Sequence, residues 1–233
     1  MLLLLATLSG LTACGTAAGQ ASGLRLAAAA LVAVLAPLFW PGIAATAAKT
    51  ALRVLGWSAA AALAAGLVVI ATRLLGWPQP LPRVLATCAM LWPILLLTHA
   101  AVAAIEWQRR AEAGSSARES AGRAGALLVS LLVALPLCLG PVAELLTDRW
   151  AGFVDTVVAL SPLTHLAVAG GNDLLRNDWL YSHSNLAALP VAYPGLPGLF
   201  GFYASVCLVL ALLAFVIARP RHTARQGAPI DLI

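Results

Sequence analysis

Long apolar runs alternate with short polar or proline-containing segments along the whole chain. A helix needs about 20 residues to cross the roughly 30 Å hydrocarbon layer of a membrane, because each residue adds about 1.5 Å. Six runs come close to that length, at residues 1–18, 26–48, 54–77, 84–105, 124–146 and 199–218. The pattern predicts an all-α, polytopic integral membrane protein with about six transmembrane helices, which form a single transmembrane domain over residues 1–233.

Two of these runs carry residues that modify a simple spanning helix. Pro37 and Pro41 flank Phe39 and Trp40, so the second run is predicted to kink or to end early. In the third run, residues 59–66 are rich in alanine and glycine. Such a face allows another helix to approach closely, although a general preference for alanine explains the same composition.

The first run, residues 1–18, has three interpretations. It contains the sequence Leu-Thr-Ala-Cys at 11–14, which is similar to a lipobox, the signal for lipid attachment to a cysteine. No Lys or Arg precedes the apolar residues, whereas a signal peptide normally begins with basic residues. A first span and the truncated start of a longer chain therefore stay open beside a lipoprotein signal.

Composition supports a lipid environment. Hydrophobic residues make up 61% of the chain and charged residues 10%, which is too little polar surface for a soluble domain of this length. The net charge of +5 does not predict nucleic-acid binding, because the basic residues lie between apolar runs and not in a patch with aromatic residues. The four cysteines form no CxxC pair, so we expect packing roles for them and no metal or other cofactor.

Basic residues predict the orientation in the membrane. Residues 107–123 are the most polar segment and are predicted to form a cytoplasmic loop, with residues 219–233 as a cytoplasmic tail. With both termini inside, nine Lys and Arg residues face the cytoplasm and five face outward. The expected location is the cell membrane, specifically the bacterial inner membrane, which the chain crosses several times.

This orientation places residues 147–198 outside the cytoplasm, as a hairpin between the last two spans. Apolar residues recur there at the spacing of one helix face, at Trp150, Phe153, Val154, Val157 and Val158. The pair Ser161-Pro162 is predicted to break this helix, because the residue before a proline disfavours helical geometry. A second short helix is predicted over residues 163–169, ended by Gly170-Gly171. The first of these helices is too short to span, so it should lie at the interface or dip into the protein.

The hairpin resembles a known family. Two final spans separated by short extracytoplasmic helices, with the sequence Leu-Ser-Pro-Leu-Thr at 160–164, are similar to the C-terminal half of ABC-2-type transporter permeases. Six spans with cytoplasmic ends also match that family. The resemblance implies a functional segment that includes Ser161, Pro162, Thr164 and His165.

The resemblance also implies an export channel made of two permease subunits, as a homodimer or heterodimer, and driven by a separate ATP-binding cassette subunit. The chain contains no GxxxxGK[ST] phosphate-binding loop, which fits a partner that supplies the ATPase. The polar turns near 49–53 and 109–123 would receive force from that ATPase. The sequence does not indicate the substrate or the direction of transport.

Two other functional classes stay open. Ser161, His165, Asp173, Asp178 and His183 could form a hydrolase or metal site, but no GxSxG or HExxH signature accompanies them, so no enzyme is predicted. A non-catalytic assembly or anchoring protein is the other alternative.

One ionisable residue lies within a predicted span. His99 is a candidate intramembrane polar site, either as a ligand or proton relay or as a neutral imidazole in a helix contact. Its neighbour Thr98 could share a hydrogen bond with another helix.

Overall fold

The computed structural model describes residues 17–71, 74, 80–113, 116–136, 151–174 and 193–218. These residues form helices and turns, and no strand occurs among them, which confirms the all-α class. The helices are α2 (Ala17–Leu35), the 3-10 helix η1 (Ala36–Phe39), α3 (Ala47–Ala71), α4 (Leu81–Ala113), α5 (Ser116–Ala134), α7 (Ala151–Leu160), α8 (Pro162–Ala169) and α10 (Leu196–Ala218).

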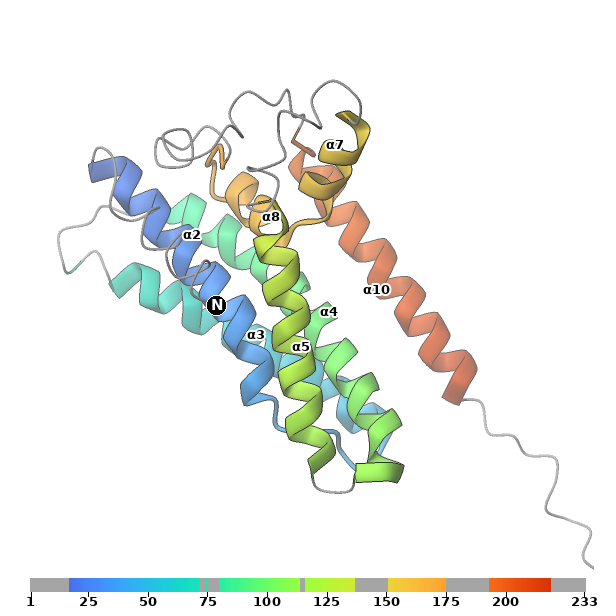
Figure 1. Cartoon of the computed structure of the whole chain (residues 1–233). Helices are drawn as coiled ribbons and strands as arrows, with labels where there is room; N and C mark the ends of the chain where they lie inside the picture. The colour runs from blue at the N-terminus through green and yellow to red at the C-terminus, as the bar shows by residue number, and fades with distance from the viewer. Residues whose placement is uncertain are drawn as a thin grey trace, which may run out of the picture.

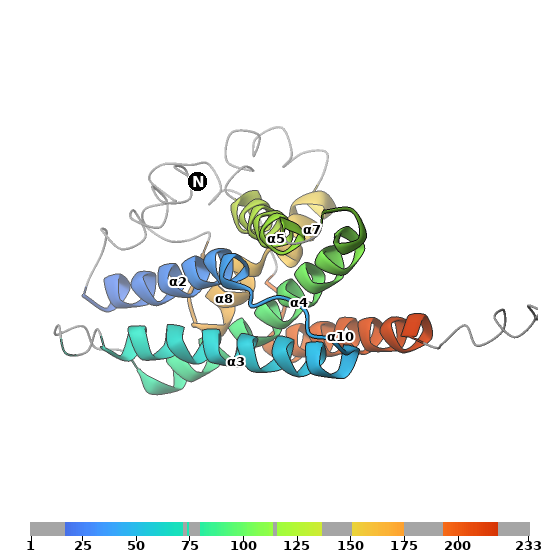
Figure 2. The same ribbon diagram turned by 90° about the horizontal axis from the view of Figure 1, so that it is seen from below.

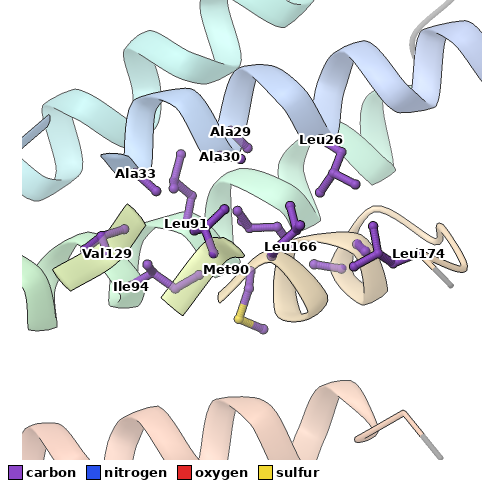
Figure 3. Packing of buried hydrophobic residues seen from close by; sticks show 14 of the residues in the cluster. Leu26, Ala29, Ala30, Ala33, Met90, Leu91, Ile94, Val129, Leu166 and Leu174 are labelled. Atoms are coloured by element: carbon purple, nitrogen blue, oxygen red, sulfur yellow. The ribbon is translucent and has the colours of Figure 1, made fainter. Parts of the chain in front are cut away.

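Helix α4 runs through the middle of the bundle and contacts α2, α3, α5, α8 and α10 (Figures 1 and 2). Its inward residues Met90, Leu91 and Leu95 are fully buried. Pro93 lies inside the helix without ending it. Figure 3 shows the centre of this core, where three alanines of α2 lie over Leu91 of α4 and beside Leu166 of α8. Small residues on α2 therefore let its backbone come close to the larger side chains of α4 and α8.

The outer surface of α3 carries large apolar side chains, whereas its inner face carries mostly smaller ones. Its buried residues recur at helical spacing and include Val54, Ser58, Ala62, Ala65 and Val69. On the outer side, the leucines at 63 and 67 are 66% and 67% exposed. Water would penalise this arrangement, but hydrocarbon does not, so the surface of α3 is suited to lipid.

Close contact between α3 and α4 fits the small-residue face that was predicted at 59–66. A Cβ atom on Gly66 would lie 2.7 Å from Sγ of Cys88, so only glycine fits there without movement of the cysteine. Cys88 is a free, partly buried thiol at this contact, as expected for a packing residue.

Two helices in the described part of the chain are long and apolar enough to cross a membrane, Ala47–Ala71 and Leu81–Arg110. The pair formed by residues 152–160 and 162–169 would add a third if it counts as one span bent by 74°. The apolar helices at 23–39 and 196–209 are shorter. The chain is therefore compatible with a membrane protein. The prediction of six spans stays a prediction, and residues 1–16 and 137–150 lie outside the described ones.

The helices end early in the second apolar run and continue into the polar segment at 107–123. The second run ends early, as the prolines predicted, because α2 stops at Leu35 and η1 contains Pro37. The segment 107–123, predicted as a loop, is mostly helical: α4 continues to Ala113 and α5 begins at Ser116. Its Ala, Glu, Gln and Arg residues are strong helix formers, and polarity alone did not stop the helix. The tail 219–233 lies outside the described residues.

Candidate functional site

The break between α7 and α8 has the geometry that its sequence predicts. Ser161 is extended, with φ −78° and ψ 123°, because it precedes a proline. Pro162 opens α8 at the first helical position, where its missing N–H costs no hydrogen bond. Helix α8 ends at Gly170-Gly171, and Gly171 has φ +67°, which favours glycine. The two short helices predicted on either side of this break are therefore present.

Helix α8 lies inside the bundle and not on its surface. It packs against α2, α4 and α5, and its residues Leu163, Leu166 and Ala167 are fully buried (Figures 1 and 3). The Ser161-Pro162 break is consequently enclosed by protein.

His165 connects three helices. Its Nδ1 atom lies 2.7 Å from the hydroxyl of Tyr203 on α10, and its Nε2 atom lies 2.7 Å from the carbonyl oxygen of Ala159 on α7. A carbonyl only accepts, so Nε2–H donates to it and Nδ1 accepts from the tyrosine hydroxyl. Both ring nitrogens are therefore engaged in holding α7, α8 and α10 together.

Ser161 and Thr164 carry hydroxyl groups with no such partners. Both residues are fully buried, and neither Oγ of Ser161 nor Oγ1 of Thr164 has a hydrogen-bond partner among the described residues. Ser161 occupies the N-cap position of α8, but its side chain does not cap the helix. The candidate segment from the sequence thus contains two unpaired polar groups at one helix end.

The hydrolase and metal interpretations lack their geometry in the part of the chain that the structure describes. Ser161 makes no hydrogen bond to His165, whose nitrogens are already engaged. Asp173 accepts a hydrogen bond from the hydroxyl of Tyr193 at 2.6 Å. No group of three His, Cys, Asp or Glu residues that could hold a metal occurs among the described residues. Asp178 and His183 lie outside them.

His99 makes a helix contact inside the bundle. Its Nδ1 atom lies 2.9 Å from Oγ of Ser58 on α3, and its ring stacks on Trp40 with centroids 5.6 Å apart. Thr98 donates to the carbonyl of Ile94 in its own helix. The hydrogen bond to another helix that was expected of Thr98 is made by His99 instead. Of the roles considered for His99 from the sequence, the hydrogen bond to Ser58 corresponds to the helix contact.

Glu106 is a buried residue that the sequence analysis missed. Its Oε2 atom accepts hydrogen bonds from Nε1 of Trp40 at 2.8 Å and from the backbone N–H of Ile43 at 3.0 Å. These bonds fix the connection between η1 and α3 to α4. Glu106 lies between the predicted span 84–105 and the predicted loop 107–123, and only its spacing of seven residues from His99, which places both on one face of α4, could have indicated burial.

Arg25 is the second buried residue that the sequence did not single out. It is 1% exposed, and its guanidinium donates to the carbonyl of Gly170 at 2.8 Å. The guanidinium of Arg83 lies beside Gly171 at the same turn. The two arginines thus meet the C-terminal end of α8, where the helix dipole favours positive charge.

No protein-family model, curated protein or solved structure matches this chain.

Proposed function

We propose that this chain is the membrane-spanning permease subunit of an ABC-type exporter of the ABC-2 kind, working with a separate ATP-binding subunit. The observation that carries the proposal is the break between α7 and α8, at which α8 packs inside an apolar bundle while α7 contacts α8 and keeps much of its surface exposed. Broken helices are tolerated at membrane depth where protein surrounds them, and transporters use them to bind substrates.

The proposal includes six spans in a bacterial inner membrane, with both termini in the cytoplasm and two permease subunits in the channel. Exposed leucines on α3 support a lipid-facing surface. Helices α3 and part of α4 have the length and apolarity that spans require.

The basic end of the bundle is the proposed docking surface for the ATPase. The guanidinium of Arg53 donates to the carbonyls of Gly42 and Ile43, and the side chain of Arg118 lies against Gly42. Exposed Arg109 and Arg110 extend this surface at the end of α4. An ATPase that engages these residues would push on α3, α4 and α5 together, because the connection at 40–44 is tied to Glu106.

Purification of the tagged chain from its native membrane in mild detergent tests this function. We expect an ATPase with a phosphate-binding loop in stoichiometric amount, and a higher ATPase turnover when the chain is bound. The double variant Arg109→Glu/Arg110→Glu should lose most of the ATPase, because charge reversal opposes docking at this end.

The control is Arg83→Glu, a single charge reversal at the opposite end of α4, which should retain the ATPase. A chain that purifies without any ATPase, and that leaves ATPase turnover unchanged after mixing, would contradict the exporter function. An assembly or anchoring protein would then be the better interpretation.

A further inference from the structure

The unpaired hydroxyls of Ser161 and Thr164 require an explanation, because a buried polar group without a hydrogen bond is unfavourable. Both side chains are fully buried, and neither has a partner among the described residues. Other buried hydroxyls of the bundle do have partners: Ser58 bonds to Val54 and Thr98 bonds to Ile94. The pair at the start of α8 is therefore a local exception.

Both hydroxyls belong to residues at the N-terminal end of α8. Ser161 is the N-cap residue itself, and Thr164 is the third residue of the helix, whose Cα–Cβ bond tilts toward the N-terminus. The backbone N–H groups of Leu163 and Thr164 also face this end, because the first helical hydrogen bond is the one from His165 to Ser161. The start of α8 thus carries two hydroxyls and two amides that are available as donors.

The charge at this point favours a negative ligand. A helix N-terminus carries a partial positive charge and binds anions through its free N–H groups. The carbonyls at the end of α7 offset little of it, since Val158 already accepts from the Ser161 amide and Ala159 from His165. Broken helices of membrane transporters direct their half-helix N-termini at anionic groups of the substrate.

We propose that the N-terminus of α8, with the hydroxyls of Ser161 and Thr164, binds one oxyanion, a phosphate or carboxylate group of the transported molecule. This substrate class rests on the proposed exporter function. The hydroxyls are enclosed in this structure, so the anion enters only when the helices around the start of α8 move apart.

Thermal unfolding of the purified chain in dodecyl maltoside tests the site. Sodium phosphate, sodium acetate and added phosphatidylglycerol are each compared with sodium chloride at equal ionic strength. We expect at least one of these oxyanions to raise the unfolding temperature by about 2–4 °C, because a ligand that binds only the folded chain stabilises it. Ser161→Ala and Thr164→Val should each lose most of this rise. Without anion, both should unfold no earlier than the original chain, because each removes an unpaired polar group.

The matched controls are Ser130→Ala and Thr98→Val, whose hydroxyls already bond to helix carbonyls, and both should keep the full response. A response to phosphate or acetate indicates a soluble anion, and a response to phosphatidylglycerol alone indicates a lipid headgroup; either supports the site. No response in the original chain, or an equal response in both site variants, would overturn it. The measurement uses the chain without an ATPase, so its failure and a failure of co-purification are separate results.

Discussion

At the scale of single residues, Glu106 holds the connection between η1 and α3. One of its side-chain oxygens accepts from both Trp40 and Ile43, and the residue is buried. Glu106→Ala leaves both donors unpaired, and each unpaired buried donor costs about 1–3 kcal/mol. We expect the free energy of unfolding to fall by roughly 2–4 kcal/mol, measured by thermal or denaturant unfolding in detergent.

Glu119 provides the control on the neighbouring helix. It pairs with Arg123 one turn away, and both side chains are 68% exposed. An exposed pair of this kind contributes only about 0.3–0.5 kcal/mol, so Glu119→Ala should leave the unfolding temperature almost unchanged. Equal losses in the two variants would show that the bonds of Glu106 are not important for stability.

The sequence identified some of the important residues and missed others, and the missed ones are buried charged residues with distant partners. Ser161 and Pro162 were identified because proline restricts the residue before it, which is a local effect. Glu106 and Arg25 were not singled out, because their partners Trp40 and Gly170 lie 66 and 145 residues away in the chain. Contacts of that kind depend on the packing of helices, which the local sequence does not contain.

At the scale of helices, contact through small residues sets the spacing of α5. A Cβ atom on Gly122 would lie 2.8 Å from the carbonyl oxygen of Pro37, which belongs to the backbone and cannot move aside easily. Gly122→Ala should therefore destabilise the chain by about 1–3 kcal/mol, in spite of the better helix propensity of alanine.

Gly56 in α3 is the matched control, because a Cβ atom there meets nothing within 4 Å. Gly56→Ala should raise the free energy of unfolding by about 0.5–1 kcal/mol, since alanine restricts the unfolded chain and favours the helix. The two substitutions thus have opposite expected signs in one unfolding assay. A stabilised Gly122→Ala variant would mean that α5 does not pack this closely on η1.

The sequence predicted helices better than their ends. The apolar runs correctly predicted helices at α3, α4 and α10, because the length of an apolar run can be read directly from the sequence. The end of α2 and the break before α8 were also predicted from the sequence, because a proline lies at each of them. The polar segment at 107–123 was predicted as a cytoplasmic loop without helices, yet most of it is helical, since charged residues with high helix propensity continue a helix beyond its apolar part.

At the scale of the whole molecule, packing brings basic residues from three helices to one end of the bundle. Arg53 of α3 and Arg118 of α5 both meet the connection at 42–43, and α4 presents Arg109 and Arg110 close to its own end there (Figure 1). These positions are far apart in the sequence, yet all belong to the segments that the positive-inside rule assigned to the cytoplasm. Their common end strengthens the expectation that this end faces inward.

Cysteine labelling in intact cells tests that orientation. In a chain whose four native cysteines are replaced, a cysteine at Ser116, in the first turn of α5, should not react with a membrane-impermeant thiol reagent. A cysteine at Asn185, which lies outside the described residues, should react. After the membrane is permeabilised, the cysteine at Ser116 should react as well, because its side chain is exposed. Labelling of Ser116→Cys and protection of Asn185→Cys in intact cells would reverse the orientation. The basic end would then face away from the cytoplasm, where no ATP-driven partner could reach it.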